Sequence, residues 1–335
     1  MSNMWNDPEQ KAAVQPLEHC TICPRRCGVN RTAGQKGRCR TSDRLMVARA
    51  ALHQWEEPCI SGKEGSGAVF FSGCSLGCVF CQNREISRAD AGQEITVERL
   101  AEIFLELQAQ HANNINLVTA CHFVPQVVRA LKRAKAEGLM IPVVYNSSGY
   151  ENVDMLKTLE GLVDIYLPDF KYMDPQLAGT LSGAADYPET ARQALQEMVR
   201  QQPEPEFDDR GIMKKGVIVR HLVLPGHVRE AKTVIGRLYE TYGDQIYLSI
   251  MNQYTPVEAV KDDPLLGRRV TKREYERVLD YALETGVTRG FFQEGKTAME
   301  SFIPPFDGTG VEKAEHGDRI ERSKKEDFEE GNHGK

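Results

Sequence analysis

The sequence predicts an α/β fold, an incomplete (β/α)6 TIM-like barrel preceded by a small cysteine-rich segment. Three observations support this fold class. Short apolar runs alternate with amphipathic runs, a loop with three cysteines directly follows the first apolar run, and four more cysteines lie within residues 20–39. Alternation of strand and helix signals is typical of a parallel sheet with helical crossovers.

The individual elements follow from local pattern. Residues 97–111 place Leu100, Ile103, Phe104 and Leu107 at helical spacing. The same reasoning predicts helices over 97–111, 125–137, 154–159, 189–200, 228–242 and 272–285. Short apolar runs predict strands over 68–71, 115–119, 141–145, 164–167, 217–224, 245–250 and 290–292.

Composition divides the chain into three parts. Residues 1–66 are a cysteine-rich segment that we expect to bind metal, and residues 67–310 are the partial barrel. Residues 311–335 are charged and nearly free of apolar side chains, which predicts a disordered tail.

Composition also excludes some classes of protein. The 335 residues are 41% hydrophobic and 27% charged, which is ordinary for a globular enzyme. A net charge of -6 argues against general nucleic-acid binding. No basic, apolar leader begins the sequence and no apolar run is long enough to span a bilayer, so we expect a cytoplasmic protein without a membrane contact.

The loop after the first predicted strand carries the chemistry. Cys74, Cys78 and Cys81 have the spacing C-x3-C-x2-C. Three thiolates are one ligand fewer than an ordinary 4Fe-4S site uses, so one iron is left open. An open iron can hold the amino and carboxylate groups of S-adenosylmethionine. The alternative, a non-catalytic protein with a structural zinc site, needs four closed ligands, and no histidine lies near the loop.

The cysteine spacing, Phe80 and the apolar run 68–71 together resemble the cluster loop of the radical S-adenosylmethionine (radical SAM) superfamily. The resemblance implies an oxidoreductase with a 4Fe-4S cluster and S-adenosylmethionine. It implies reductive cleavage of this cofactor to a 5'-deoxyadenosyl radical, which abstracts hydrogen from a substrate.

Residues 67–292 further resemble the activating enzymes of pyruvate formate-lyase, in a branch with extra N-terminal cysteines. The matching runs are Asn-Ser-Ser-Gly-Tyr at 146–150, the D-x-K motif within 164–174 and R-x-x-x-x-P-G within 219–226. The run Ala-Leu-His-Gln-Trp-Glu-Glu-Pro-Cys at 51–59 resembles the branch with extra N-terminal cysteines. This resemblance implies a glycine of a glycyl radical enzyme as substrate and a reductant such as flavodoxin or ferredoxin. Another peptide or a small molecule remains an alternative substrate.

One departure affects cofactor binding. Activating enzymes carry Gly-Gly-Glu after the second strand, where this chain has Val-Thr-Ala-Cys-His-Phe-Val at 118–124. Other polar groups at strand ends must then hold S-adenosylmethionine. The candidates are Thr119, His122, Asn146, Ser148, Asp169, Lys171 and Arg220.

Four of these candidates have alternative explanations. Asp169 and Lys171 lie two apart on one face of a strand end, so they form an ion pair or contact a ligand. Arg220 needs a carboxylate, either a protein group such as Asp169 or that of the cofactor. A lone histidine such as His122 is often simply packed.

A second set of cysteines lies near the N-terminus. Cys20, Cys23, Cys27 and Cys39 supply four soft ligands with the spacing C-x2-C-x3-C-x11-C. Zinc or an auxiliary iron–sulfur cluster fits this set, and reduced structural thiols remain the alternative.

Overall fold

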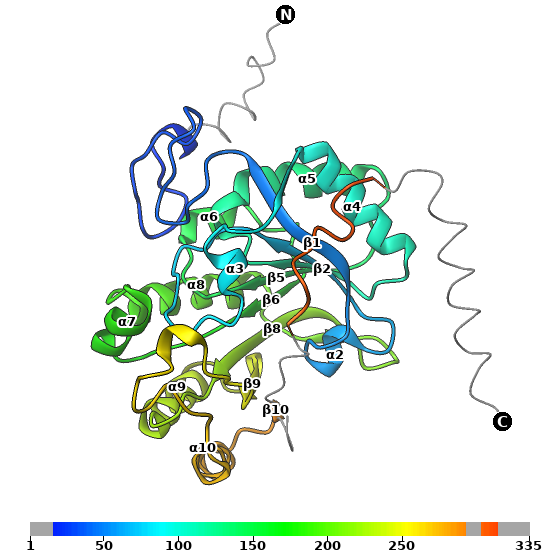
Figure 1. Ribbon diagram of the computed structural model, residues 1–335. Helices are drawn as coiled ribbons and strands as arrows, with labels where there is room; N and C mark the ends of the chain where they lie inside the picture. The colour runs from blue at the N-terminus through cyan, green and yellow to red at the C-terminus, as the bar shows by residue number, and fades with distance from the viewer. Residues whose placement is uncertain (1–15, 293–302, 314–335) are drawn as a thin grey trace, which may run out of the picture.

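The computed structural model describes residues 16–292 and 303–313. Its centre is a run of parallel strands hydrogen-bonded in chain order (Figure 1). These strands are β2 (Ser66–Phe71), β4 (Ile115–Val118), β5 (Val143–Ser147), β6 (Ile165–Pro168), β8 (Met213–Leu222), β9 (Tyr247–Met251) and β10 (Gly290–Phe292). No strand pairing in the described residues joins β10 back to the other end, so the predicted incomplete barrel is confirmed.

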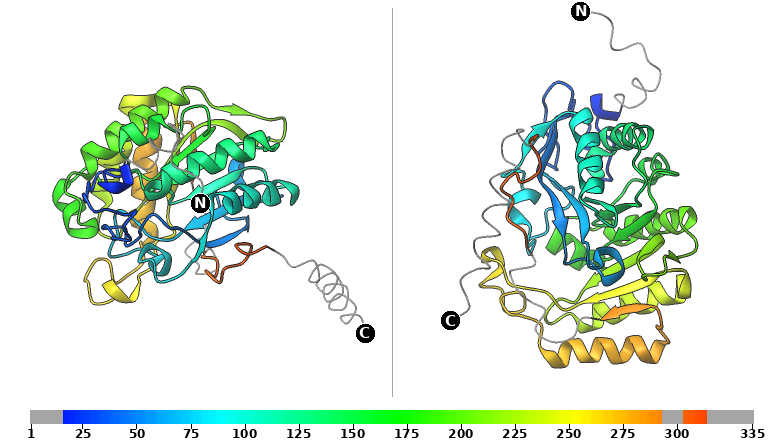
Figure 2. Two further views of the ribbon diagram at one scale, coloured as in Figure 1. Left: turned by 90° about the horizontal axis from the view of Figure 1, so that it is seen from above. Right: turned by 90° about the vertical axis from the view of Figure 1, so that its right-hand side faces the viewer.

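The helices that follow the parallel strands lie outside the sheet, as Figure 2 shows. Those that follow the parallel strands are α4 (Val97–Ala109), α5 (Val124–Ala136), α6 (Val153–Lys157), α8 (Tyr187–Gln201), α9 (Val228–Tyr242) and α10 (Lys272–Thr285). All six correspond to predicted helices. Local signals fix their ends: Thr96 accepts a 3.1 Å hydrogen bond from the Arg99 amide, and Thr271 with Glu274 forms a capping box.

The sheet also extends in a way that the sequence pattern did not predict. Strand β1 (Leu45–His53) pairs antiparallel with β2, and β3 (Gln93–Ile95) pairs with β1. Residues 45–53 therefore lie in the main sheet, although they belong to the part expected to be a cysteine-rich appendage. A two-residue strand, β7 (Glu206–Phe207), pairs with β8.

Three short helices were not predicted: α2 (Pro58–Ser61), α3 (Arg84–Ser87) and α7 (Pro175–Ser182). Each contains at most eight residues, and a run that short carries little helical periodicity. Single-turn helices of the 3-10 type occur at Cys121–Phe123, Gly243–Gln245 and Glu258–Val260.

Helix α2 fills the interior of the half-barrel. Cys59 and Ile60 pack against strand residues that include Val144, Ile165 and Ile218. The neighbours of these residues along each strand, such as Tyr166, belong to the large core under the outer helices. Since successive side chains of a strand point to opposite faces, α2 lies on the concave face, where it closes one end of the barrel.

The C-terminal described segment, 303–313, runs along β1 (Figure 1). The Ala50 amide donates to the Thr309 carbonyl at 2.9 Å, and the Arg99 side chain donates to the Val311 carbonyl at 2.9 Å. Apart from residues 311–313, the predicted disordered tail lies outside the described residues. No helix within residues 16–292 and 303–313 is long and apolar enough to cross a membrane.

Candidate functional site

The cluster loop follows β2, at the carboxyl ends of the parallel strands. Cys74, Cys78 and Cys81 line a common cavity of about 140 Å³. Gly73 enters this loop with φ of +94°, and a Cβ there would lie 2.6 Å from the Cys39 carbonyl oxygen. Glycine is therefore required, both by its backbone conformation and by the close approach of the N-terminal segment.

The three thiols are close enough to influence one another. Burial raises the pKa of Cys74, and together with the smaller effects of Cys78 and Cys81 it brings this pKa to about 12. Burial and Cys78 also raise the pKa of Cys81. Thiolates crowded in this way need a positive partner, which an iron–sulfur cluster supplies. The residues present thus fit a cluster held by three cysteines.

One of these sulfurs has a hydrogen-bond donor. The Ser182 hydroxyl, at the end of α7, donates to Cys78 Sγ at 2.9 Å. The Tyr172 hydroxyl lies 2.9 Å from Ser182 Oγ and fixes its position. Both residues are almost fully buried, with 2% and 0% exposure. Such partners tune a metal site through its ligands.

A larger cavity of about 500 Å³ adjoins the cluster loop. Four polar residues from successive strand ends line both cavities: Asn146, Asp169, Lys171 and Arg220. Cys78 and Cys81 also line both. The two cavities are therefore continuous along a polar wall, which connects the thiol groups to the interior of the barrel.

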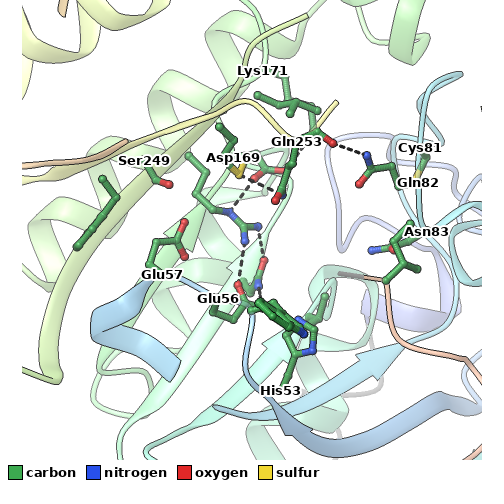
Figure 3. Close-up of a pocket in the computed structure, with 18 of the residues that line it drawn as sticks. His53, Glu56, Glu57, Cys81, Gln82, Asn83, Asp169, Lys171, Ser249 and Gln253 are labelled. Atoms are coloured by element: carbon green, nitrogen blue, oxygen red, sulfur yellow. Dashed lines mark hydrogen bonds and ion pairs between the residues drawn. The ribbon is translucent and has the colours of Figure 1, made fainter. Parts of the chain in front are cut away.

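This wall is a network of buried charges (Figure 3). Arg220 donates to Asp169 Oδ1 at 3.0 Å, to Glu56 Oε2 at 3.2 Å and to Asn146 Oδ1 at 2.6 Å. Lys171 Nζ lies 2.6 Å from Asp169 Oδ2. Burial alone would raise the pKa of Asp169, but Lys171 and Arg220 lower it below its usual value. Of the alternatives that the sequence left open for Asp169, Lys171 and Arg220, the ion pairs are present.

Two glutamates at the start of α2 also line the larger cavity. Glu56 accepts hydrogen bonds from Asn116 at 3.1 Å and from Asn146 at 3.3 Å. Glu57 is 8% exposed, and its Oε2 atom is buried without a hydrogen-bond partner among the described residues. Burial raises the pKa of both carboxyls, and Arg220 opposes this effect.

The other predicted cofactor ligands are placed as follows. Thr119 and Ser148 line the smaller cavity, and Thr119 has φ of +61°, a conformation that is uncommon for a residue other than glycine. His122 does not line either cavity. Its Nε2 atom lies 2.7 Å from the Ser72 carbonyl, and burial lowers its pKa to about 3. His122 thus packs beneath the cluster loop as a neutral side chain.

The N-terminal cysteines lie in loops directly behind the cluster loop. Burial raises the pKa of Cys23 to about 12, with smaller contributions from Cys39, Cys20 and Cys27. No group of three or more His, Cys, Asp or Glu side chains in the described ranges surrounds a single metal-ion position. An iron–sulfur cluster spreads its ligands over several irons, so this absence concerns sites for a single metal ion.

Two arginines attach this segment to the barrel. Arg25 donates to the Ser75 carbonyl of the cluster loop at 2.9 Å and to the Ser182 carbonyl at 3.0 Å. Arg31 is fully buried and donates to the His122 carbonyl at 2.6 Å. The N-terminal segment therefore supports the loop that carries Cys74, Cys78 and Cys81.

Sequence reasoning missed Glu56 and Glu57 as site residues. Residues 51–59 served there only as evidence of resemblance to a branch of the activating enzymes. A signal was present, because two adjacent acidic residues lie between apolar Trp55 and the buried Cys59. Such carboxylates are rarely buried without a role.

A partial parallel barrel with three cysteines at a strand end defines a class of radical enzyme that carries an iron–sulfur cluster. Residues 68–230 match the family model described as the Radical SAM superfamily. This segment is therefore a radical SAM domain, and membership of the superfamily implies a 4Fe-4S cluster and S-adenosylmethionine as cofactors.

A relative matches most of the chain. This chain is 29% identical over 283 residues to an uncharacterized protein of Methanocaldococcus jannaschii, and the match covers 82% of this chain and 78% of that protein.

Solved structures resemble parts of the chain. A domain of a pyruvate-formate lyase-activating enzyme from Bacteroides vulgatus is 10% identical, with 51% of this chain and 91% of that chain covered and a TM-score of 0.37. SuiB of Streptococcus suis bound to S-adenosylmethionine is 14% identical, with 66% and 48% covered and a TM-score of 0.43. The chain thus spans about half the length of SuiB.

Proposed function

We propose that this protein cleaves S-adenosylmethionine reductively and directs the resulting radical to a substrate in the larger cavity. The observation that carries the proposal is the continuity of the two cavities. Three thiols line one cavity, and the second extends from them into the interior of the barrel. When bound, a 4Fe-4S cluster with one open iron supplies the electron that breaks the carbon–sulfur bond.

The chain's own residues hold and orient the reactants. Cys74, Cys78 and Cys81 are the proposed cluster ligands. Asp169 and Lys171 are positioned beside them, and the coulombic effect of Lys171 lowers the pKa of Cys81 against the stronger effect of burial. Helix α2 closes one end of the barrel and so limits access of water to a radical.

The cofactor itself needs polar contacts that do not depend on a Gly-Gly-Glu run. We propose Thr119, Asn146, Ser148, Asp169, Lys171 and Arg220 for this role, because all six line the smaller cavity beside the thiols. His122 is proposed to act indirectly, through packing under the loop.

The resemblance to activating enzymes suggests a glycine of a glycyl radical enzyme as substrate, with flavodoxin or ferredoxin as the electron donor. The buried acidic pair in the larger cavity favours a second candidate, a peptide or small molecule that is modified directly. The two differ in outcome. Activation leaves one stable glycyl radical signal per partner, whereas direct modification gives a product that accumulates over many turnovers.

The N-terminal cysteines are proposed to hold zinc or an auxiliary cluster. Their segment contacts the cluster loop through Arg25 and Arg31. Either metal would stabilise this support, and a cluster would in addition relay electrons. Metal analysis of the wild type and of Cys20→Ser distinguishes the two metals from free thiols.

The test is anaerobic reconstitution of the full chain with iron and sulfide. Electron paramagnetic resonance should show a 4Fe-4S signal that changes when S-adenosylmethionine is added, and dithionite should then produce 5'-deoxyadenosine. Cys78→Ala should abolish this cleavage, because two cysteines do not retain the cluster. Cys59→Ala, which changes a buried cysteine in α2, is the matched control and should retain the signal. Cleavage that persists in Cys78→Ala would refute the proposal.

A further inference from the structure

The larger cavity has an unbalanced set of buried charges. Among the described residues that line it, three are acidic, Glu56, Glu57 and Asp169, and two are cationic, Lys171 and Arg220. Asp169 pairs with both cations, and Glu56 pairs with Arg220. Among the described residues, Glu57 forms no ion pair within 4 Å.

Glu57 is also the carboxylate with an unused acceptor. Its Oε2 atom is buried and has no hydrogen-bond partner in the described part of the chain. The residue lines the larger cavity and is absent from the lining of the smaller one. Figure 3 shows Glu57 and Ser249 on the side of the cavity opposite Cys81. The Glu57 side chain therefore lines the part of the cavity that lies across from the proposed cluster.

The other described residues that line the cavity are apolar or neutral. Trp55, Phe291 and Phe292 contribute aromatic surface to the cavity. His53 adds no positive charge near neutral pH, because burial and Arg49 lower its pKa. A ligand group at this end meets aromatic faces and one unpaired carboxylate, which together suit a cation.

We infer that the larger cavity binds its substrate through a cationic nitrogen group, a primary ammonium or a guanidinium, that donates N–H hydrogen bonds to the Glu57 carboxylate. This group makes the charges equal and satisfies the orphan acceptor, which otherwise costs free energy in a buried site. The inference rests on the proposed function, because it specifies the substrate class of the same site.

The inference is tested by calorimetric binding to the full chain with its cluster reconstituted and S-adenosylmethionine saturating. The probes are pentylamine, which is cationic at neutral pH, and 1-pentanol, which has nearly the same shape without charge. Pentylamine should bind at least about tenfold more tightly, since hydrogen bonds between charged groups are the stronger ones.

Variants locate the binding group. Glu57→Gln should lower the affinity for pentylamine at least about tenfold and leave that for 1-pentanol nearly unchanged. Glu57→Asp keeps the charge and should retain the preference for the amine, which preserves the test if the glutamine variant does not fold. Glu240→Gln, which removes an exposed carboxylate on α9 that pairs with Arg237, is the matched control and should bind like the wild type.

Two outcomes overturn the inference. Equal binding of both probes means that Glu57 does not select a cation. If pentylamine binds only when S-adenosylmethionine is left out, and Glu57→Gln weakens the binding of pentylamine and of S-adenosylmethionine equally, the carboxylate is assigned to the ammonium of the cofactor instead. Formation of 5'-deoxyadenosine is measured separately without any amine, so failure of the proposed cleavage is distinguished from failure of cation binding.

Discussion

Arg220 is the only guanidinium in the described lining of the larger cavity, and its removal has a calculable cost. Its side chain is 15% exposed and contacts Glu56, which is 9% exposed, and Asp169, which is 19% exposed. Removing one partner from a buried ion pair leaves an uncompensated charge and destabilises a protein by about 3–5 kcal/mol. We expect a loss of this size in the free energy of unfolding for Arg220→Met, a substitution that keeps much of the volume.

The assay is denaturant unfolding of the full chain, anaerobic and with cluster, near neutral pH. The matched control is Arg210→Met, because Arg210 is 53% exposed and pairs with Glu64 and Asp208. Exposed pairs contribute about 0–1 kcal/mol, so the control should change little. Adding Glu56→Gln to Arg220→Met should recover at least about 1 kcal/mol, because it removes the carboxylate left unpaired.

The loss should also depend on pH. Burial raises the pKa of Glu56 and Glu57, and Arg220 opposes the rise, so its removal raises both values further. A carboxyl with a raised pKa contributes stability below its unfolded pKa and loses it as pH rises through the folded value. The difference between wild type and Arg220→Met should therefore be smaller at about pH 5 than at about pH 8. A loss below about 1 kcal/mol at both pH values would refute the buried-network reasoning.

Two further predictions concern single buried groups. Ser182→Ala should lower the reduction potential of the cluster by about 40–60 mV, if the lost hydrogen bond to Cys78 is about 1–1.4 kcal/mol stronger in the reduced state. Ser182→Thr is the control and should keep the wild-type potential in a redox titration. An unchanged potential in Ser182→Ala would contradict the 2.9 Å contact. Burial raises the pKa of Glu151 to about 8, against hydrogen bonds from Tyr145 and Ser147, so this carboxyl contributes stability below its unfolded pKa and loses it up to about pH 8. Unfolding measured across this range should show a flatter dependence on pH for Glu151→Gln, and a slope equal to that of the wild type would exclude a buried neutral carboxyl.

Much of the barrel could be predicted because its signals are local. The helices over 228–242 and 272–285 were placed at their observed ends, since periodicity, Thr271 and Gly286 all act within one turn. Strand β1 was missed because it lies after a cysteine-rich segment and pairs with β2 only through tertiary contact. The short helices α2 and α7 have no periodicity that distinguishes them from loops.

The sequence alone predicts a cluster loop. The spacing of Cys74, Cys78 and Cys81 sets three ligands within one short loop, and an apolar strand before it places the loop at a sheet edge. It also identified Asp169, Lys171 and Arg220 as strand-end charges that need partners.

The partners of those charges depend on tertiary packing. Glu56 and Glu57 come from a segment more than one hundred residues before Asp169 in the chain, and the packing of Cys59 and Ile60 into the barrel interior brings them to the cavity. Sequence patterns record which side chains prefer burial, whereas the pairing of distant buried charges depends on how one element fits inside another. For this reason the reactive loop was predictable, and the acidic end of the cavity was not.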